Sequence, residues 1–264
     1  MKRAAGTTGG DDDRDGDAGA NGGREQGAGD ASGNGGNALR ADDVAVAAYR
    51  GLLRRFHRTL DLMSPRAYAD LDRFLAEAES YAQAVLELAP RAGVVLDLGT
   101  GAGLPGVVVA ARLAGREVWW VERRRRRAAF RRQVAAEAGL GSVRVVADDV
   151  RTVTPPPSGV VAVTAQAVGT LTEVAKATRH LWGPRVLLVS RRGPDWDDEV
   201  AALTAWWRRF ARPGAAGQMD AVGNTTDAYA DQAVAQGQLA DPRVLRAEPL
   251  GARGTLVAVE LRGG

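Results

Sequence analysis

Residues 94–106 constrain the fold more than any other stretch of this chain. They read VVLDLGTGAGLPG, which is an apolar run followed directly by a glycine-rich segment. Glycines at such a point let the backbone turn sharply and let a ligand approach it closely, and Pro105 suits the first turn of a following helix. The stretch therefore predicts a buried strand, a tight turn and a helix, which is the opening unit of an α/β domain.

Short apolar runs recur after this unit, and most of the segments between them have the length of a crossover helix. The candidate strands are Val94–Leu98, Val118–Val121, Val143–Val146, Val160–Thr164, Val186–Val189 and Thr255–Val259. Strands that are apolar throughout and separated by helices indicate a parallel sheet covered on both faces. The predicted fold class is α/β, with a doubly wound Rossmann-like sheet, and Asp195–Phe210 is predicted as one of the covering helices.

The composition divides the chain into three parts. Residues 1–40 hold 12 of the 33 glycines and a cluster of aspartates, so we expect a disordered tail that buries too little apolar surface to fold. Residues 41–92 carry apolar residues at helical spacing and are predicted to form an N-terminal helical element. Residues 93–264 form the α/β domain, in which residues 212–242, rich in Gly, Ala and Gln, are predicted to be an irregular insertion.

The charge and the residue types that are missing narrow the function. The tail has five basic and seven acidic residues, which leaves 30 basic and 25 acidic residues, a net charge of +5, for the remainder. A moderately basic folded part suits a polyanionic partner. The sequence has no cysteine and two histidines, which argues against disulfides, thiolate nucleophiles and a metal centre. No apolar run is long enough for a membrane span or a secretory signal, so we expect a cytoplasmic protein without a membrane partner. We also expect the protein to be a monomer.

The glycine-rich turn permits two kinds of ligand. Its GxGxxG spacing is a weak signal that a nicotinamide enzyme would also satisfy. Asp97, however, precedes Gly99 by two residues, where a carboxylate would repel a pyrophosphate but engage an ammonium group, directly or through water. The complete DxGxGxG pattern resembles the first motif of class I methyltransferases, and this resemblance implies S-adenosylmethionine as the cofactor. The residues expected to contact it in this segment are Asp97, Gly99, Thr100, Gly101, Gly103 and Leu104.

Two later strand ends carry acidic residues. Glu122 ends the second strand, 23 residues after Gly99, where a carboxylate can accept hydrogen bonds from both hydroxyls of a ribose. Asp148, Asp149 and Val150 follow the third strand, at the place where class I methyltransferases often hold an acid beside the adenine amino group. One of the two aspartates is expected to do this, and the other to lie on the surface.

Seven arginines fall within the ten residues from Arg123 to Arg132. Two interpretations remain open: a solvated helix face in an arginine-rich protein, or contacts to the phosphates of a folded RNA, which position the RNA without reading its sequence. The candidate RNA-binding residues are Arg123, Arg124, Arg126, Arg127 and Arg131.

Together these segments resemble one family, the glucose-inhibited division protein B family, which methylates N7 of a guanine in 16S rRNA. LDLGTGAGLPG at residues 96–106 is similar to the family's cofactor motif nearly letter for letter. The resemblance covers residues 49–193 without gaps and returns in the hairpin formed by residues 249–260. It implies an S-adenosylmethionine-dependent methyltransferase whose partner is 16S rRNA or the small ribosomal subunit.

The chain also departs from the family pattern. Gln166 stands where the family usually has an active-site arginine, and it is the candidate catalytic residue for that reason. Ala76 replaces a histidine, and Val150-Arg151 replaces an Ala-Glu step. These departures leave three alternatives: a small-molecule methyltransferase with the same fold, a non-catalytic RNA-binding paralogue, and, less favoured by the glycine motif, a nicotinamide oxidoreductase.

Overall fold

A computed structural model describes residues 41–210, 240–251 and 254–262. The predicted tail at residues 1–40 and most of the predicted insertion lie outside the described residues. No helix within the described ranges is both long and apolar enough to cross a membrane.

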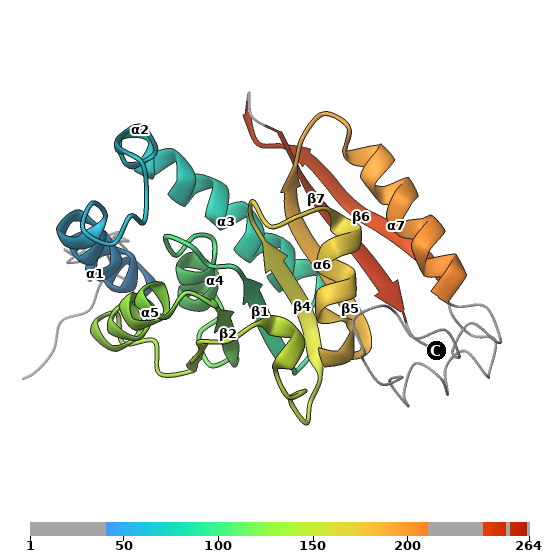
Figure 1. Cartoon of the computed structure of the whole chain (residues 1–264), viewed down its shortest axis with the longest axis horizontal. Coiled ribbons are helices and arrows are strands. Elements are labelled where there is room, and N and C mark those ends of the chain that lie inside the picture. The colour runs from blue at the N-terminus through green and yellow to red at the C-terminus, as the bar shows by residue number, and fades with distance from the viewer. Residues whose placement is uncertain (1–40, 211–239, 252–253, 263–264) are drawn as a thin grey trace, which may run out of the picture. The chain divides into compact units, whose positions relative to one another are not determined.

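The described residues form a seven-stranded sheet in the order β3-β2-β1-β4-β5-β7-β6 (Figure 1). β1 to β5 are parallel, whereas β7 runs antiparallel to both β5 and β6. This confirms the predicted doubly wound α/β fold. The strands are β1 (Val94–Leu98), β2 (Val118–Val121), β3 (Val143–Val146), β4 (Val160–Ala165), β5 (Trp182–Arg192), β6 (Ala240–Pro249) and β7 (Thr255–Arg262).

β6 is the one strand of the described sheet that the sequence pattern missed, and residues 240–242 at its start were assigned to the insertion. It lies at the edge of the sheet and is largely exposed, with the burial pattern of a surface strand. An edge strand needs no continuous apolar run, so its residues ADPRVLRAEP gave no strand signal.

Helices cover both faces of the sheet. One face carries α1, α3, α4 and α5, and the other carries α6 and α7, while the short α2 precedes α3. Two single-turn 3-10 helices, η1 and η2, lie beside the sheet. Their bounds are α1 (Ala41–Phe56), α2 (Pro65–Ala69), α3 (Leu71–Leu88), α4 (Gly106–Arg112), α5 (Arg125–Glu137), η1 (Val150–Thr152), α6 (Leu171–Thr178), η2 (Arg179–Leu181) and α7 (Trp196–Phe210).

The alternation of side chains along each central strand explains the apolar runs. Trp120 of β2 packs into the core on the α4 side of the sheet, whereas Trp119 packs on the α6 side, and both are buried. Because both faces are covered, most positions of these strands are apolar; Asp97 of β1 and Thr164 of β4 are buried polar residues near the strand ends.

Tyr49 and Leu53 of α1 belong to the same core as α4. Within the N-terminal helical element, α1 packs mainly against α4 and α5, whereas α3 packs against β5 and β7 of the sheet.

Candidate functional site

The turn between β1 and α4 has the backbone that its glycines predicted. Gly99, Gly101 and Gly103 have φ angles of 66°, 45° and 121°, which residues with a Cβ rarely adopt. A Cβ on Gly101 would meet only the Gly99 oxygen, at 3.6 Å, so this side of the turn has room for a ligand. A Cβ on Gly106 would overlap Asp97, which is why α4 can start close against the strands. We call residues 99–105 the glycine loop.

Asp97 lies beneath this loop and is fully buried. Its Oδ1 accepts a hydrogen bond of 2.6 Å from the Thr164 hydroxyl of β4, and its Oδ2 has no hydrogen-bond partner among the described residues. Burial raises the pKa of Asp97 to about 7, against the opposing effects of the Thr164 hydrogen bond and of the charge on Arg131. With no exposed surface, this carboxyl group offers no direct contact to a ligand in this conformation.

Glu122 lies at the end of β2, close to the glycine loop, and is largely buried. Its Oε2 accepts a hydrogen bond from the Gly101 amide at 3.3 Å, and its Oε1 accepts one from the Arg124 amide at 2.9 Å. A carboxylate has about four lone-pair sites, so Glu122 can still accept hydrogen bonds from a diol. The parallel pairing of β1 with β2 places Glu122 beside the glycine loop.

The two aspartates after β3 differ in their surroundings. Asp149 caps η1 and is paired with Arg151, whose guanidinium donates to both carboxylate oxygens at 3.0 and 2.6 Å. Hydrogen bonds from the Arg151 side chain and backbone hold the pKa of Asp149 at about 2. Asp148 is exposed, and its Oδ1 accepts only the Asp149 amide, at 2.8 Å. Val150 is buried in the core on the α6 side.

Gln166 follows β4 directly, in the segment 166–170 that leads to α6. This segment lies against the glycine loop, because a Cβ on Gly99 would meet the Val168 side chain at 2.6 Å. Leu98 and Ala165 are paired residues of β1 and β4, so Gln166 and Gly99 leave the sheet side by side. Gln166 is half-buried, and its amide stands at the same edge of the sheet as Glu122.

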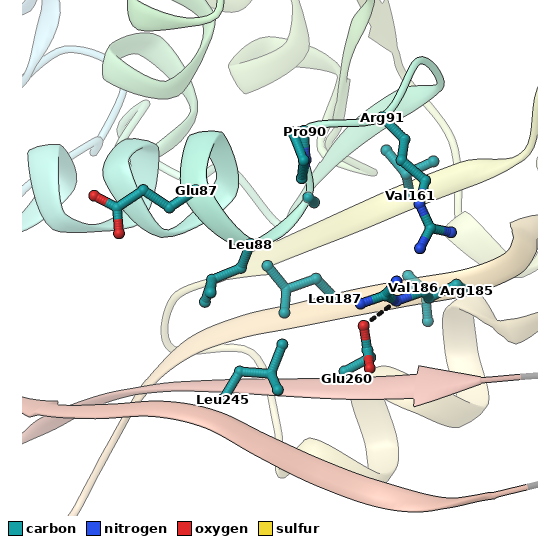
Figure 2. A pocket seen from close by; sticks show the side chains of 11 residues that line it. Glu87, Leu88, Pro90, Arg91, Val161, Arg185, Val186, Leu187, Leu245 and Glu260 are labelled. Atoms are coloured by element: carbon teal, nitrogen blue, oxygen red, sulfur yellow. Dashed lines mark hydrogen bonds and ion pairs between the residues drawn. The ribbon is translucent and has the colours of Figure 1, made fainter.

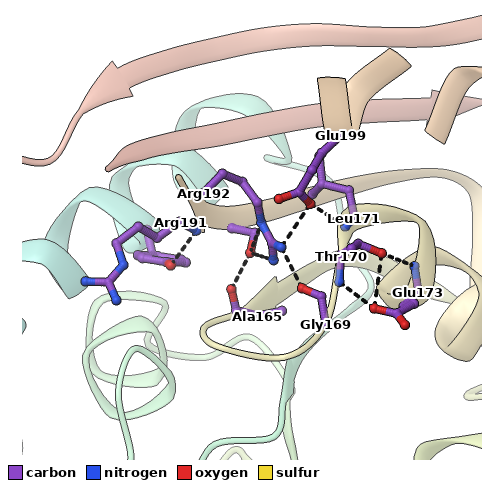
Figure 3. Close-up of polar contacts among 10 residues, drawn as sticks. Ala165, Gly169, Thr170, Leu171, Glu173, Arg191, Arg192 and Glu199 are labelled. Atoms are coloured by element: carbon purple, nitrogen blue, oxygen red, sulfur yellow. Dashed lines mark hydrogen bonds and ion pairs between the residues drawn. The ribbon is translucent and has the colours of Figure 1, made fainter. Parts of the chain in front are cut away.

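Arg192 at the end of β5 holds the 166–170 segment in place (Figure 3). Its Nη1 donates to the Gly169 oxygen at 2.6 Å and to Glu199 of α7 at 3.1 Å. Ser190 accepts from the Arg192 Nε at 3.1 Å and itself donates to the Ala165 oxygen at 2.6 Å. Strand β5 and helix α7 therefore fix the backbone on either side of Gln166. Sequence reasoning missed this network. The signal that could have indicated it is a charged residue, Arg192, at the end of an apolar strand.

The arginines of 123–127 lie at the start of α5. Arg123, Arg124, Arg125 and Arg126 are exposed. Arg127 is half-buried, and its Nη2 donates to the Asp61 oxygen at 2.7 Å. The first turn of α5 carries no acidic residue, although the positive end of a helix dipole disfavours cations. The exposed cluster is compatible with a solvated helix face and with contacts to phosphates, and both interpretations stay predictions.

Arg131 does not belong to this surface, and its assignment to RNA binding is wrong. Its relative exposure is 0%. The guanidinium points under the glycine loop, where Nε donates to the Thr100 hydroxyl at 3.0 Å and Nη2 donates to the Thr100 oxygen at 3.1 Å and to the Gly101 oxygen. Sequence reasoning grouped the arginines by proximity, but their position around the helix axis decides which one is buried.

A separate pocket of about 300 Å³ lies where the parallel strands begin, away from the glycine loop (Figure 2). Its walls include Leu88, Val161 and Leu245, and Arg185 within it pairs with the buried Glu260. The sequence-predicted site residues lie elsewhere. No cluster of metal-binding side chains occurs within residues 41–210, 240–251 and 254–262.

The chain is similar to known proteins over the part that builds this site. The sequence model of the GidB family, rRNA small subunit methyltransferase G, matches residues 44–209, from α1 to α7. The chain is 32% identical over 165 residues to ribosomal RNA small subunit methyltransferase G of Rhodopseudomonas palustris (strain BisB5), covering 61% of this chain and 69% of the relative. The protein of the same name from Stenotrophomonas maltophilia (strain K279a) is 30% identical over 176 residues, covering 64% and 80%. That of Acidothermus cellulolyticus is 36% identical over 137 residues, covering 51% and 59%.

The raised pKa of Asp97 predicts how stability depends on pH. The folded protein holds this proton up to about pH 7, whereas the unfolded chain releases it near pH 4. Between these values the free energy of unfolding falls as the pH rises. Asp97→Asn keeps an oxygen that can accept the Thr164 hydroxyl but does not titrate. The stability of the variant relative to the native protein should therefore increase from about pH 4 to 7 and then stay constant, measured by urea unfolding.

Thr164→Val is the matched control. It removes the hydrogen bond that opposes the raised pKa, so in this variant the fall in stability should extend to higher pH. A native-to-Asp97→Asn difference that is the same at every pH would show that Asp97 titrates alike in the folded and unfolded chains.

Proposed function

The chain belongs to the rRNA small subunit methyltransferase G family, and we propose that it transfers a methyl group from S-adenosylmethionine to N7 of a guanine in 16S rRNA. The observation that carries this proposal is the match of residues 44–209 to the family, because these residues include the glycine loop, Glu122 and the 166–170 segment. The partner is 16S rRNA or the small ribosomal subunit that contains it.

The residues at the strand ends fit the proposed cofactor. Gly101 leaves room beside the loop, and Glu122 keeps free lone pairs for the two hydroxyls of a ribose. Of the two aspartates after β3, Asp148 is the candidate for the adenine amino group, because Arg151 occupies both oxygens of Asp149. Leu104 is half-buried at the end of the loop and extends the proposed binding surface, whereas Thr100, Gly103 and Val150 are buried, and their contact with the cofactor stays a prediction. When bound, the cofactor supplies an electrophilic methyl group on a sulfonium.

The proposed reaction does not require the protein to supply a general base. Guanine N7 carries an in-plane lone pair and needs no deprotonation before it attacks a methyl group. The protein can act by holding the base and the methyl donor in line. Gln166 leaves the sheet beside the glycine loop, and we assign to its amide a hydrogen bond to the target base. The target must be unstacked, as in an RNA loop, because side chains read A-form grooves poorly.

Methyl transfer to small-subunit RNA tests the proposal. Purified protein with labelled S-adenosylmethionine should label 16S rRNA from a strain that lacks the modification, and digestion should give N7-methylguanosine by mass spectrometry.

Calorimetry with S-adenosylhomocysteine should show one binding site. Glu122→Gln should weaken this binding about tenfold or more, because the variant loses charge-assisted hydrogen bonds.

The two measurements separate the alternatives. Binding of S-adenosylhomocysteine without transfer to any RNA would contradict the RNA substrate and favour a small-molecule methyltransferase or a non-catalytic paralogue. Binding of NAD in place of S-adenosylhomocysteine would contradict the cofactor.

Salt dependence tests the exposed arginines. Each phosphate contact contributes about 0.7 to 0.9 to the slope of log affinity against log salt concentration. The double variant Arg123→Gln/Arg126→Gln should therefore lower the slope for 16S rRNA binding by about 1.5 to 2, with the affinity for S-adenosylhomocysteine unchanged.

Arg209→Gln serves as the control for this measurement. Arg209 is exposed on α7, on the opposite face of the sheet, so its replacement should leave the slope unchanged. If the double variant keeps the native slope, the cluster is a solvated helix face.

Replacement of Gln166 tests its assigned hydrogen bond. Loss of one buried or partly buried hydrogen bond costs about 1 to 3 kcal/mol, so Gln166→Ala should lower the transfer rate on 16S rRNA by about 5- to 150-fold. The affinity for S-adenosylhomocysteine should stay within about twofold. Gln166→Arg should retain transfer, since arginine donates hydrogen bonds to the same base.

Gln83→Ala is the matched control, because Gln83 is exposed on α3 and bonds only to Glu87 within the described chain. If Gln166→Ala transfers methyl groups at the native rate, Gln166 does not contribute to the reaction.

A further inference from the structure

A buried cation lies directly beneath the glycine loop. Arg131 reaches from α5 to the loop and donates three hydrogen bonds to two successive residues, Thr100 and Gly101. It is fully buried, and its Nη1 has no hydrogen-bond partner in the described part of the chain. Arg125, Arg126 and Arg132 of the same helix are exposed and Arg127 is half-buried, so Arg131 is the arginine of α5 that is buried beneath the loop.

A second buried side chain continues the contact along the loop. The hydroxyl of Tyr49, from α1, donates to the Ala102 oxygen at 3.1 Å. A Cβ on Gly103 would overlap the Arg131 guanidinium and lie 2.9 Å from the Tyr49 ring, so this glycine is needed for both side chains to pack against the loop. Three successive carbonyls, of residues 100, 101 and 102, thus point inward to Arg131 and Tyr49.

The direction of these carbonyl groups also determines the direction of the N–H group in the same peptide unit. In a trans peptide the N–H lies opposite the C=O, so the amides of Gly101 and Ala102 face away from Arg131. The Gly101 amide does so, because it donates to Glu122 Oε2 on the ligand side at 3.3 Å. The Gly101 amide and the Glu122 carboxylate are therefore held in one arrangement from beneath, while the Gly103 amide closes the turn on the Thr100 oxygen at 2.7 Å.

Core packing alone does not account for this cation. Replacing a buried charge by an apolar side chain of similar volume is often neutral or stabilising. Here the guanidinium lies near two buried carboxylates at strand ends, Asp97 and Glu122, which lower the cost of burying it. Burial lowers the pKa of Arg131 to about 10, so the side chain stays charged at neutral pH.

We propose that Arg131, assisted by Tyr49, is a positioning residue of the cofactor site: it holds the glycine loop in the conformation that binds the cofactor. This inference rests on the proposed function for the identity of the ligand, S-adenosylmethionine. It assigns no contact with the ligand to Arg131 and no contact with RNA.

The first test uses the protein without ligand. Arg131→Met fills a similar volume without the charge or the donors. Hydrogen–deuterium exchange of the amides of residues 101–103 should be at least about tenfold faster in this variant, and unchanged in Arg126→Met, whose arginine is exposed on the same helix. Native exchange rates in Arg131→Met would overturn the proposal.

The second test uses the ligand. In Arg131→Met the KM for S-adenosylmethionine and the Kd for S-adenosylhomocysteine should rise about tenfold or more, with kcat within about twofold. Arg131→Lys keeps one charged donor and should restore part of the affinity. A merely structural role would instead lower kcat through a smaller active fraction. The salt slope for RNA binding should be native, and a reduced slope would show that Arg131 contacts phosphate and overturn the proposal.

Tyr49→Phe is a second variant that tests the proposal even if Arg131→Met does not fold. It removes only the hydroxyl that holds the Ala102 oxygen, so exchange at Gly103 should quicken and the Kd for S-adenosylhomocysteine should rise about threefold or more. Native values for both would overturn the proposal. If the native protein does not bind S-adenosylhomocysteine, the proposed function fails, while the exchange measurement still decides whether Arg131 holds the loop.

Discussion

The hydrogen bonds from Arg131 to the glycine loop connect the parts of the site that come from different segments of the chain. The loop follows β1, the guanidinium comes from α5, and Tyr49 joins from α1. The loop closes one backbone hydrogen bond on itself, from the Gly103 amide to the Thr100 oxygen at 2.7 Å, and the side chains of Arg131 and Tyr49 pair with the oxygens of residues 100, 101 and 102 from beneath. The proposed ligand surface, which the loop forms with Glu122, therefore depends on a contact that lies wholly inside the protein.

Opposite charges lie close together among the buried polar side chains at this edge of the sheet, which lowers the cost of burying them. Asp97 and Glu122 are buried at adjacent strand ends, and Arg131 is buried between them and the loop. Each alone would carry a large desolvation penalty. Together they leave two polar atoms without a partner, Oδ2 of Asp97 and Nη1 of Arg131, within the described residues. Such orphaned atoms are uncommon in protein cores, and within the described residues Arg116 and Thr172 carry the others.

The helix α5 uses one residue type for two purposes. At its start, Arg123 to Arg126 are exposed beside the strand end that carries Glu122. Two turns later Arg131 is turned inward, packed beside Phe130 and the loop. On the other side of the glycine loop, Arg192 holds the segment that carries Gln166. The exposed arginines are available to a polyanion, whereas the two buried ones shape the surfaces on which that polyanion would be modified.

The sequence by itself determined the elements whose signal is local. Strands β1, β2 and β3 begin and end where the apolar runs do. For β1 and β2 the reason is that a parallel strand buried on both faces is predominantly apolar, whereas β3 is a partly exposed edge strand. The glycine loop and Glu122 followed from φ requirements and from the meeting of strand ends at one edge of the sheet. Only the tertiary structure decided which arginine of α5 is buried, that Arg151 occupies Asp149, and that β6 completes the sheet. These outcomes depend on helix phase, on ion-pair geometry and on edge pairing, which arise between segments and leave no periodic pattern within any one of them.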